Sequence, residues 1–199
     1  MDKVGVFVDG GFFSVLTKYI FPNEDGTPRK IDTHIFSELL CEDNKGELLR
    51  TYFYHCSPYQ SQYPTDEEKK MKRGYDSWMY ALKQLKQTQI REGRLKKTFD
   101  EQGKPDYIQK GVDVLLAIDM LKLALKGALQ KIILISSDSD FVPVVRALRD
   151  EGISVILYYY KPEIEMRGEK GSCFSQDLYD ECDERKLLLK DLFGKATIK

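Results

Sequence analysis

The sequence contains little of what common cofactor and metal sites require. It has two histidines, His34 and His55, which lie far apart, and four cysteines, none of them in a CxxC pair. This favours reduced thiols and argues against structural zinc, although His55 and Cys56 are adjacent. A GxxxxGK[ST] loop is absent as well, which excludes nucleotide binding through a P-loop.

Long apolar runs and an excess of charge of one sign are also missing. No stretch approaches the roughly 20 apolar residues that span a bilayer, and acidic and glycine residues stand where a secretory signal would continue. We therefore expect a cytoplasmic protein without membrane contact. The 31 basic and 32 acidic residues nearly cancel, so binding of nucleic acid requires a local patch. The sequence leaves the oligomeric state open, a homo-oligomer included.

Short apolar segments alternate with helical patterns along the 199 residues. The runs at 3–9, 131–136 and 153–160 are typical of strands buried on both faces of a parallel sheet. We expect further strands at 48–56 and 94–99, and helices at 12–20, 32–41, 65–91, 111–126 and 141–150. This alternation predicts a mixed α/β fold: a three-layer α/β/α sandwich with a mostly parallel, doubly wound (Rossmann-like) sheet.

The expected organisation is one domain, residues 1–160, with a C-terminal extension, residues 161–199, packed on it. A loop containing Gly103 and Pro105 precedes the helix at 111–126. The extension is charged and contains glycines until a helix near 183–193. We see no internal repeat and no low-complexity tract.

Four aspartates occupy the positions where open α/β sheets place ligands. Asp9 closes the first strand, Asp138 and Asp140 follow the strand at 131–136, and Asp113 opens the helix before that strand. Ligand sites of such sheets lie beyond the carboxyl ends of the strands. The four carboxylates are therefore expected to meet at one edge.

Carboxylates brought together repel one another unless a cation neutralises them. Mg²⁺ prefers oxygen ligands, clamps a phosphate and lowers the pKa of a bound water, so the chemistry needs no histidine. None lies near the proposed site in the sequence. Each acid also has a structural interpretation, because an Asp after a strand can form a turn or cap a helix. Asp119, on the same helix as Asp113, is either a buried acid with its own partner or a residue that supports or joins the site.

Three segments, VGVFVDGGFF, KGVDVLLAIDML and ILISSDSDFVPVVRALRDEGISVILY, resemble the NYN domain family of the PIN-like nuclease superfamily. The resemblance implies a PIN-like sandwich and a ribonuclease site that holds Mg²⁺ or Mn²⁺. Asp9, Asp113, Asp138 and Asp140 match the family's catalytic, metal-binding acids, and Asp119 matches a second acid often present in that helix. Many members carry Asn in a D-G-x-N turn after the first strand, where this chain has Phe12 or Phe13.

Basic residues gather between 83 and 110, eight of them against four acidic ones, with aromatic residues within or beside the stretch. A basic groove with aromatic platforms is typical of single-stranded nucleic-acid binding. Lys110, just ahead of Asp113, and Lys96 and Lys97 are the candidate contacts to RNA. The alternative is a solvated surface, with Tyr75 and Trp78 in the core.

The function that we expect is hydrolysis of phosphodiester bonds in single-stranded or structured RNA. The first alternative is a non-catalytic RNA-binding or protein-interaction module with the same fold. A phosphoryl-transfer domain fits less well. A haloacid-dehalogenase-type phosphatase needs a second Asp where this chain has Gly11, and a receiver domain has its paired acids near the N-terminus.

Overall fold

The fold is built on one seven-stranded sheet in the order β4-β3-β2-β1-β5-β6-β7. The computed structural model describes residues 1–99, 102–103, 105–161 and 173–198. The strands are β1 (Asp2–Asp9), β2 (Gly46–Cys56), β3 (Thr88–Phe99), β4 (Pro105–Lys110), β5 (Lys131–Ile135), β6 (Ser154–Tyr159) and β7 (Glu184–Leu187). All neighbours pair in parallel except β3 and β4, which are antiparallel. The expected α/β class with a mostly parallel sheet is confirmed.

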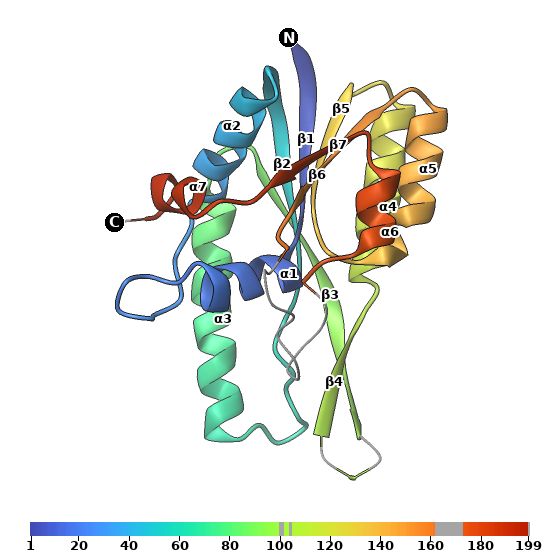
Figure 1. Ribbon diagram of the computed structural model, residues 1–199. Helices are drawn as coiled ribbons and strands as arrows, with labels where there is room; N and C mark the ends of the chain where they lie inside the picture. The colour runs from blue at the N-terminus through green and yellow to red at the C-terminus, as the bar shows by residue number, and fades with distance from the viewer. Residues whose placement is uncertain (100–101, 104, 162–172, 199) are drawn as a thin grey trace.

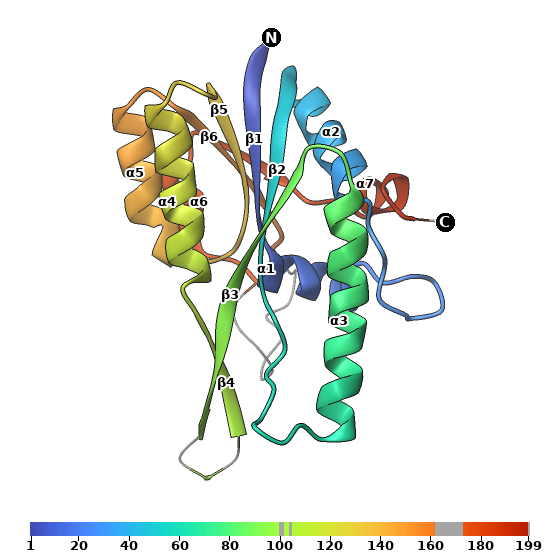
Figure 2. The same cartoon turned by 180° about the vertical axis from the view of Figure 1, so that it is seen from behind.

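Helices cover both faces of this sheet (Figures 1 and 2). They are α1 (Gly10–Val15), which continues as a π-helical turn (Leu16–Ile20), α2 (Thr33–Asp43), α3 (Asp66–Gln84), α4 (Val112–Leu125), α5 (Val142–Asp150), α6 (Gln176–Glu181) and α7 (Lys190–Lys195). One face carries α1, α2, α3 and α7, and the other carries α4, α5 and α6. No helix among the described residues is long and apolar enough to span a bilayer.

The buried stretches of β1 and β5 are continuously apolar because both faces of these strands are covered. Along β1, Val6 and Val8 pack on the side of α1, α2 and α3, whereas Phe7 packs on the side of α4 and α5. On β5, Ile133 and Leu134 divide between the two faces in the same way. Burial on both faces therefore explains the continuous apolar runs in the sequence.

The expected end of the long helix near Arg91 is wrong. Helix α3 ends at Gln84, and β3 begins at Thr88, which pairs with Thr51 of β2. The chain turns at Gln87, whose φ of 49° is incompatible with a continuing helix. The apolar helical spacing stops at Leu85, so the pattern itself ended where the helix does.

Two further expectations are wrong in the second half of the chain. The segment after Gly103, expected as a loop, contains β4, and the helix expected near 183–193 is replaced by β7 and α7. Strand β7 is short and polar, as edge strands often are. The Asp183 carboxylate accepts a hydrogen bond from the Val155 amide at 2.8 Å and so aligns β7 with β6. The sequence pattern of a polar edge strand is too weak to identify.

The C-terminal residues contribute to the same core as the first strands. Phe193 of α7 is fully buried and contacts the rings of Phe13, Phe21 and Phe36. Residues 162–172, in the charged part of the expected extension, lie outside the described residues. A domain boundary at residue 160 stays a prediction.

Gly10 and Gly74 should respond oppositely to alanine. A Cβ on Gly10 would lie 2.4 Å from the Tyr54 carbonyl oxygen, whereas nothing lies within 4 Å of one on Gly74 in α3. Because the Tyr54 carbonyl belongs to the sheet, Gly10→Ala should destabilise the protein by about 2 kcal/mol. Gly74→Ala should instead stabilise it by up to about 1 kcal/mol through helix propensity. Urea unfolding measures both, and a Gly10→Ala protein as stable as the parent would contradict this packing.

Candidate active site

The sheet changes its direction of winding between β1 and β5. From β1, the strands β2 and β3 follow on one side, and β5 and β6 follow on the other. In doubly wound sheets, ligands bind in the crevice beyond the carboxyl ends of the strands at such a switch point. Asp9 ends β1, Ser136 follows β5, and Asp113 lies in the first turn of α4.

Asp9 links the two central strands to the first helix. Its Oδ1 accepts hydrogen bonds from the amides of Gly11 (2.9 Å) and Phe12 (3.3 Å), which caps α1. Its Oδ2 accepts from the Ser136 hydroxyl at 3.1 Å. The fully buried Ser136 Oγ also accepts from the Asp138 amide at 3.2 Å. The sequence motif S-x-D-x-D contained this serine, but its bridging role depends on β1 and β5 being neighbours.

Asp113 lies within electrostatic range of the other three acids. Burial raises the pKa of Asp9 from its ordinary 3.8 to about 6, against the effect of its hydrogen bonds, and the charge of Asp113 contributes to the rise. Burial also raises the pKa of Asp113, with further contributions from Asp138 and Asp140. The structure thus brings the four acids to one edge of the sheet.

Asp138 and Asp140 form the turn that leads into α5. The Oδ1 of Asp138 accepts from the Asp140 amide at 2.9 Å and caps the short 3₁₀ turn Ser139–Phe141. Asp140 itself is exposed. Across the described part of the chain, no three His, Cys, Asp or Glu side chains are already grouped closely enough to hold a metal ion. The acids gather without forming a finished coordination shell, and their role as ligands stays a prediction.

Asp119 has partners of its own. Its Oδ2 accepts hydrogen bonds from the Tyr54 hydroxyl and from Arg91 Nε, both at 2.9 Å. Of the two interpretations of this acid, the structure favours the buried carboxylate with a partner. Sequence alone did not connect Asp119 with Arg91 because these residues meet only across α4 and β3.

His55, which is distant from Asp9, Asp113 and Asp138 in the sequence, lies beside the acidic edge in the structure. It follows Tyr54, which pairs with Asp9, and its Cδ2 would lie 2.7 Å from a Cβ on Gly10. Its Nδ1 is 2.8 Å from the Cys56 carbonyl oxygen, and its Nε2 is 3.4 Å from the Ser14 hydroxyl. Burial lowers the pKa of His55 and favours the neutral ring. The parallel pairing of β1 with β2 brings His55 to this place, and the two expected strands at 3–9 and 48–56 did not by themselves establish that pairing.

The phenylalanines that replace the family's Asn belong to the core. Phe12 and Phe13 are 6% and 5% exposed. Phe13 makes edge contacts with Phe36 and Phe53 at ring-centroid distances of 5.3 and 5.7 Å. The turn after β1 is instead held by the Asp9 cap and by Ser14, whose hydroxyl donates to the Gly10 carbonyl at 2.6 Å.

The basic stretch divides between internal pairs and exposed residues. Arg91 pairs with Asp119, and Lys83 Nζ lies 3.5 Å from Glu92. Tyr75 is buried, and Trp78 packs against the core, so the interpretation of these two rings as core residues holds. Lys96 and Lys110 are exposed, and Lys97 is half-buried. Lys110 ends β4, directly before the turn that carries Asp113.

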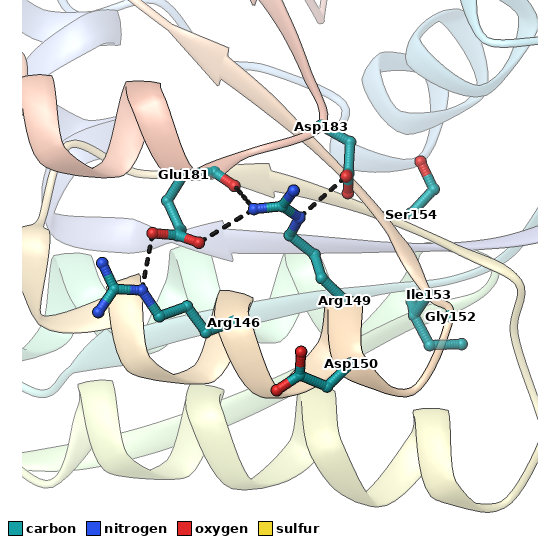
Figure 3. A pocket seen from close by; sticks show the side chains of 8 residues that line it. All are labelled: Arg146, Arg149, Asp150, Gly152, Ile153, Ser154, Glu181 and Asp183. Carbon is teal, nitrogen blue, oxygen red and sulfur yellow. Dashed lines mark hydrogen bonds and ion pairs between the residues drawn. The ribbon is translucent and has the colours of Figure 1, made fainter.

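A hollow lies at the opposite end of the strands from the acids, beside the start of β6 (Figure 3). Arg149 stands between Glu181 and Asp183, with nitrogen–oxygen distances of 3.0 Å to each carboxylate. Arg146 Nε lies 2.8 Å from Glu181. These charges neutralise one another and join α5 to the segment from α6 to β7, so we interpret the hollow as a structural contact.

A doubly wound sheet with carboxylates gathered at its switch point places this protein in the PIN-like α/β class. Residues 3–184 match the NYN domain, a PIN-like nuclease domain family, and the chain belongs to this family. No curated protein matches. A crystal structure of a protein of unknown function from Vibrio parahaemolyticus RIMD 2210633 is similar, with a TM-score of 0.55 and 15% identity, over 99% of this chain and 96% of that one. That likeness concerns the fold alone.

Asp9→Asn should stabilise the metal-free protein at neutral pH. The pKa of Asp9 is about 6 in the folded protein and near 3.8 when exposed, so ionisation favours unfolding. The gain should grow between about pH 4 and pH 6 and stay constant above, up to about 3 kcal/mol. Asn retains an oxygen that can cap α1.

Urea unfolding of parent and Asp9→Asn proteins in chelator, from pH 4 to pH 8, measures this difference. Ser175→Asn, at the cap of α6 and away from the acids, controls for a change of cap chemistry. A variant that loses stability as the pH rises relative to the parent would contradict the buried charge.

Proposed function

We propose that the protein is a metal-dependent ribonuclease that hydrolyses phosphodiester bonds of single-stranded or structured RNA. Asp9, Asp113, Asp138 and Asp140 would hold Mg²⁺ or Mn²⁺. The observation that carries the proposal is the position of Asp113 in electrostatic range of the other three acids, at the switch point of an NYN domain.

The chemistry of these residues fits a hard divalent cation. All four donors are carboxylates, and Mg²⁺ and Mn²⁺ prefer oxygen ligands. The raised pKa values of Asp9 and Asp113 mean that their negative charges are poorly compensated within the protein. Asp9 Oδ1 accepts from two amides, whereas Oδ2 accepts from Ser136 and has a second lone pair for a further partner. A bound cation would therefore offset the unfavourable burial and mutual repulsion of these carboxylates.

The protein's own residues supply position and charge. When bound, the cation would polarise the phosphate and lower the pKa of a water that attacks it. Ser136 holds the Asp9 carboxylate and the Asp138 amide in a fixed relation. Lys110, exposed beside this edge, can attract the phosphate backbone, and Lys96 and Lys97 extend the positive charge along β3.

A non-catalytic RNA-binding module is the alternative. Two observations favour it: Asp138 has a complete structural role as a cap, and no three candidate ligands of the described chain are already arranged around a metal position. Such a module would use the same edge and the same lysines to bind RNA without hydrolysis. Cleavage assays separate the two functions directly.

Asp138→Asn should abolish most cleavage and leave the fold intact. Asn can still accept from the Asp140 amide and cap the turn, but the edge loses one negative charge. Single-turnover cleavage of labelled single-stranded RNA with Mn²⁺ or Mg²⁺ should fall about 100-fold or more. The control is Asp150→Asn, an exposed acid at the opposite edge of the sheet. Cleavage in chelator, or equal turnover by a folded Asp138→Asn protein, would defeat the mechanism, and a parent without cleavage supports the binding module.

Lys96→Ala combined with Lys97→Ala should weaken RNA binding without changing the chemistry of cleavage. Loss of two phosphate contacts should lower the slope of log affinity against log salt by up to about 1.4 for a single strand. The matched control is Lys122→Ala with Lys126→Ala, two exposed lysines at the far end of α4. Fluorescence anisotropy between low and moderate salt measures both pairs. An unchanged slope would identify the basic stretch as a solvated surface.

A further inference from the structure

Beyond the layered body, β3 and β4 continue as a two-stranded arm, here defined as Arg94–Phe99 and Pro105–Lys110. Lys97 stands opposite Tyr107 and Lys96 opposite Ile108 in this antiparallel pair. Both views show the arm extending past α4, α5 and α6, while the lower end of α3 reaches a similar level on the other face (Figures 1 and 2). A two-stranded ribbon is only marginally stable by itself. Its exposed side chains therefore call for a functional explanation.

One face of the arm is aromatic. Phe99 and Tyr107 are 67% and 45% exposed, and the Tyr107 ring lies 5.4 Å from that of Tyr59, on the loop after β2. Lys97 Nζ is 5.5 Å from the Phe99 centroid and 5.7 Å from the Tyr59 centroid. We call Tyr59, Phe99 and Tyr107 the aromatic face. It presents ring surfaces to solvent around a central positive charge.

The arm is also basic. Its strands contain Arg94, Lys96, Lys97 and Lys110 against a single acid, Asp106. Side chains alternate along a strand, so Lys96, together with its partner Ile108, points away from the face that carries Lys97 and Tyr107. Both sides of the arm thus offer cations in a protein whose overall charge is nearly zero.

The base of the arm is packed against the candidate active site. A Cβ on Gly93 would lie 3.1 Å from Cys56 Sγ and 2.9 Å from the Lys110 carbonyl oxygen. Asp113 follows Lys110, the last residue of β4, after only Gly111 and Val112, so it lies close to this base. Tyr107 is three residues from Lys110, or about 10 Å along the strand. A polymer held on the arm is therefore near enough to reach the acids.

We propose that the aromatic face binds the unpaired bases of an RNA strand by stacking, with Lys97 and the other cations of the arm near the phosphates. The inference rests on the proposed function for the identity of the polymer. Unpaired bases have free ring surfaces, whereas those of a duplex are stacked on one another. Charge complementarity favours RNA over a protein segment, since the arm has four cations and one acid in its strands. The arm would thus make this enzyme selective for single-stranded regions.

The test measures binding without cleavage. Anisotropy in chelator would follow a labelled single-stranded RNA, the same strand annealed to its complement, and a single-stranded DNA of the same sequence. Phe99→Ala and Tyr107→Ala should each weaken binding of the single strand about tenfold, and duplex binding little. Phe99→Tyr and Tyr107→Phe, which keep the rings, should bind as the parent does. Tyr80→Ala, which removes a 69% exposed ring on α3, is the matched control, and thermal unfolding verifies each fold.

Each outcome separates the stacking site from the nuclease. Equal binding by parent and alanine variants overturns the inference, as does equal loss on single strand and duplex or a parent that binds no RNA in chelator. Equal loss on single-stranded RNA and DNA supports stacking without recognition of the sugar. If the alanine variants lose binding while the parent cleaves nothing, the stacking site stands and the nuclease fails. If the parent cleaves and its binding is insensitive to the rings, the nuclease stands and the stacking site fails.

Discussion

The carboxylate of Asp9 is the constraint on which the edge of the sheet depends. It ends the central strand, caps α1 through one oxygen and holds Ser136, beyond β5, through the other. Its place next to Gly10 is fixed because the Tyr54 carbonyl leaves no room for a side chain there. Burial makes the Asp9 charge unfavourable, and Asp113 adds to that cost. The hydrogen bonds of Asp9 thus hold this end of the sheet together but leave the negative charges of Asp9 and Asp113 poorly compensated. A divalent cation would compensate them.

The sequence predicted the elements whose patterns are local and apolar. Strands β1, β5 and β6 read as continuous apolar runs, and α4 begins within one residue of the expected position, at Val112. The carboxyl ends of parallel strands lie at the same side of a sheet. Because Asp9 ends one such strand and Asp138 follows another, the order of strands and acids in the sequence already predicted that these two acids lie at the same side. Polar elements were not predictable in this way. Strand β7 has the sequence ERKL, and β4 depends on its pairing with β3 for its identity.

Asp113 and Asp119 show why a role for each acid could not be read from the chain. Both lie on α4 and look alike in sequence, but their partners come from elsewhere. Arg91 on β3 and Tyr54 on β2 compensate Asp119 with hydrogen bonds of 2.9 Å. Asp113 instead lies within electrostatic range of three acids, and burial together with the charges of Asp138 and Asp140 raises its pKa. A partly buried carboxylate is tolerated when it is paired and becomes a candidate site when its neighbours carry the same charge. Only the tertiary arrangement of β2, β3 and α4 distinguishes these cases.

The arm and the acids are joined by very little chain. Between Lys110, the last residue of β4, and Asp113 lie only Gly111 and Val112. Gly111 has a φ of 80°, a left-handed conformation that glycine adopts without strain, and Val112 is buried in the core. At the other strand, Gly93 lets Cys56, Lys110 and Val112 approach closely. The base of the arm is therefore closely packed although its strands project into solvent. A strand of RNA held on the arm would lie within reach of Asp113, because only two residues separate this acid from the end of β4.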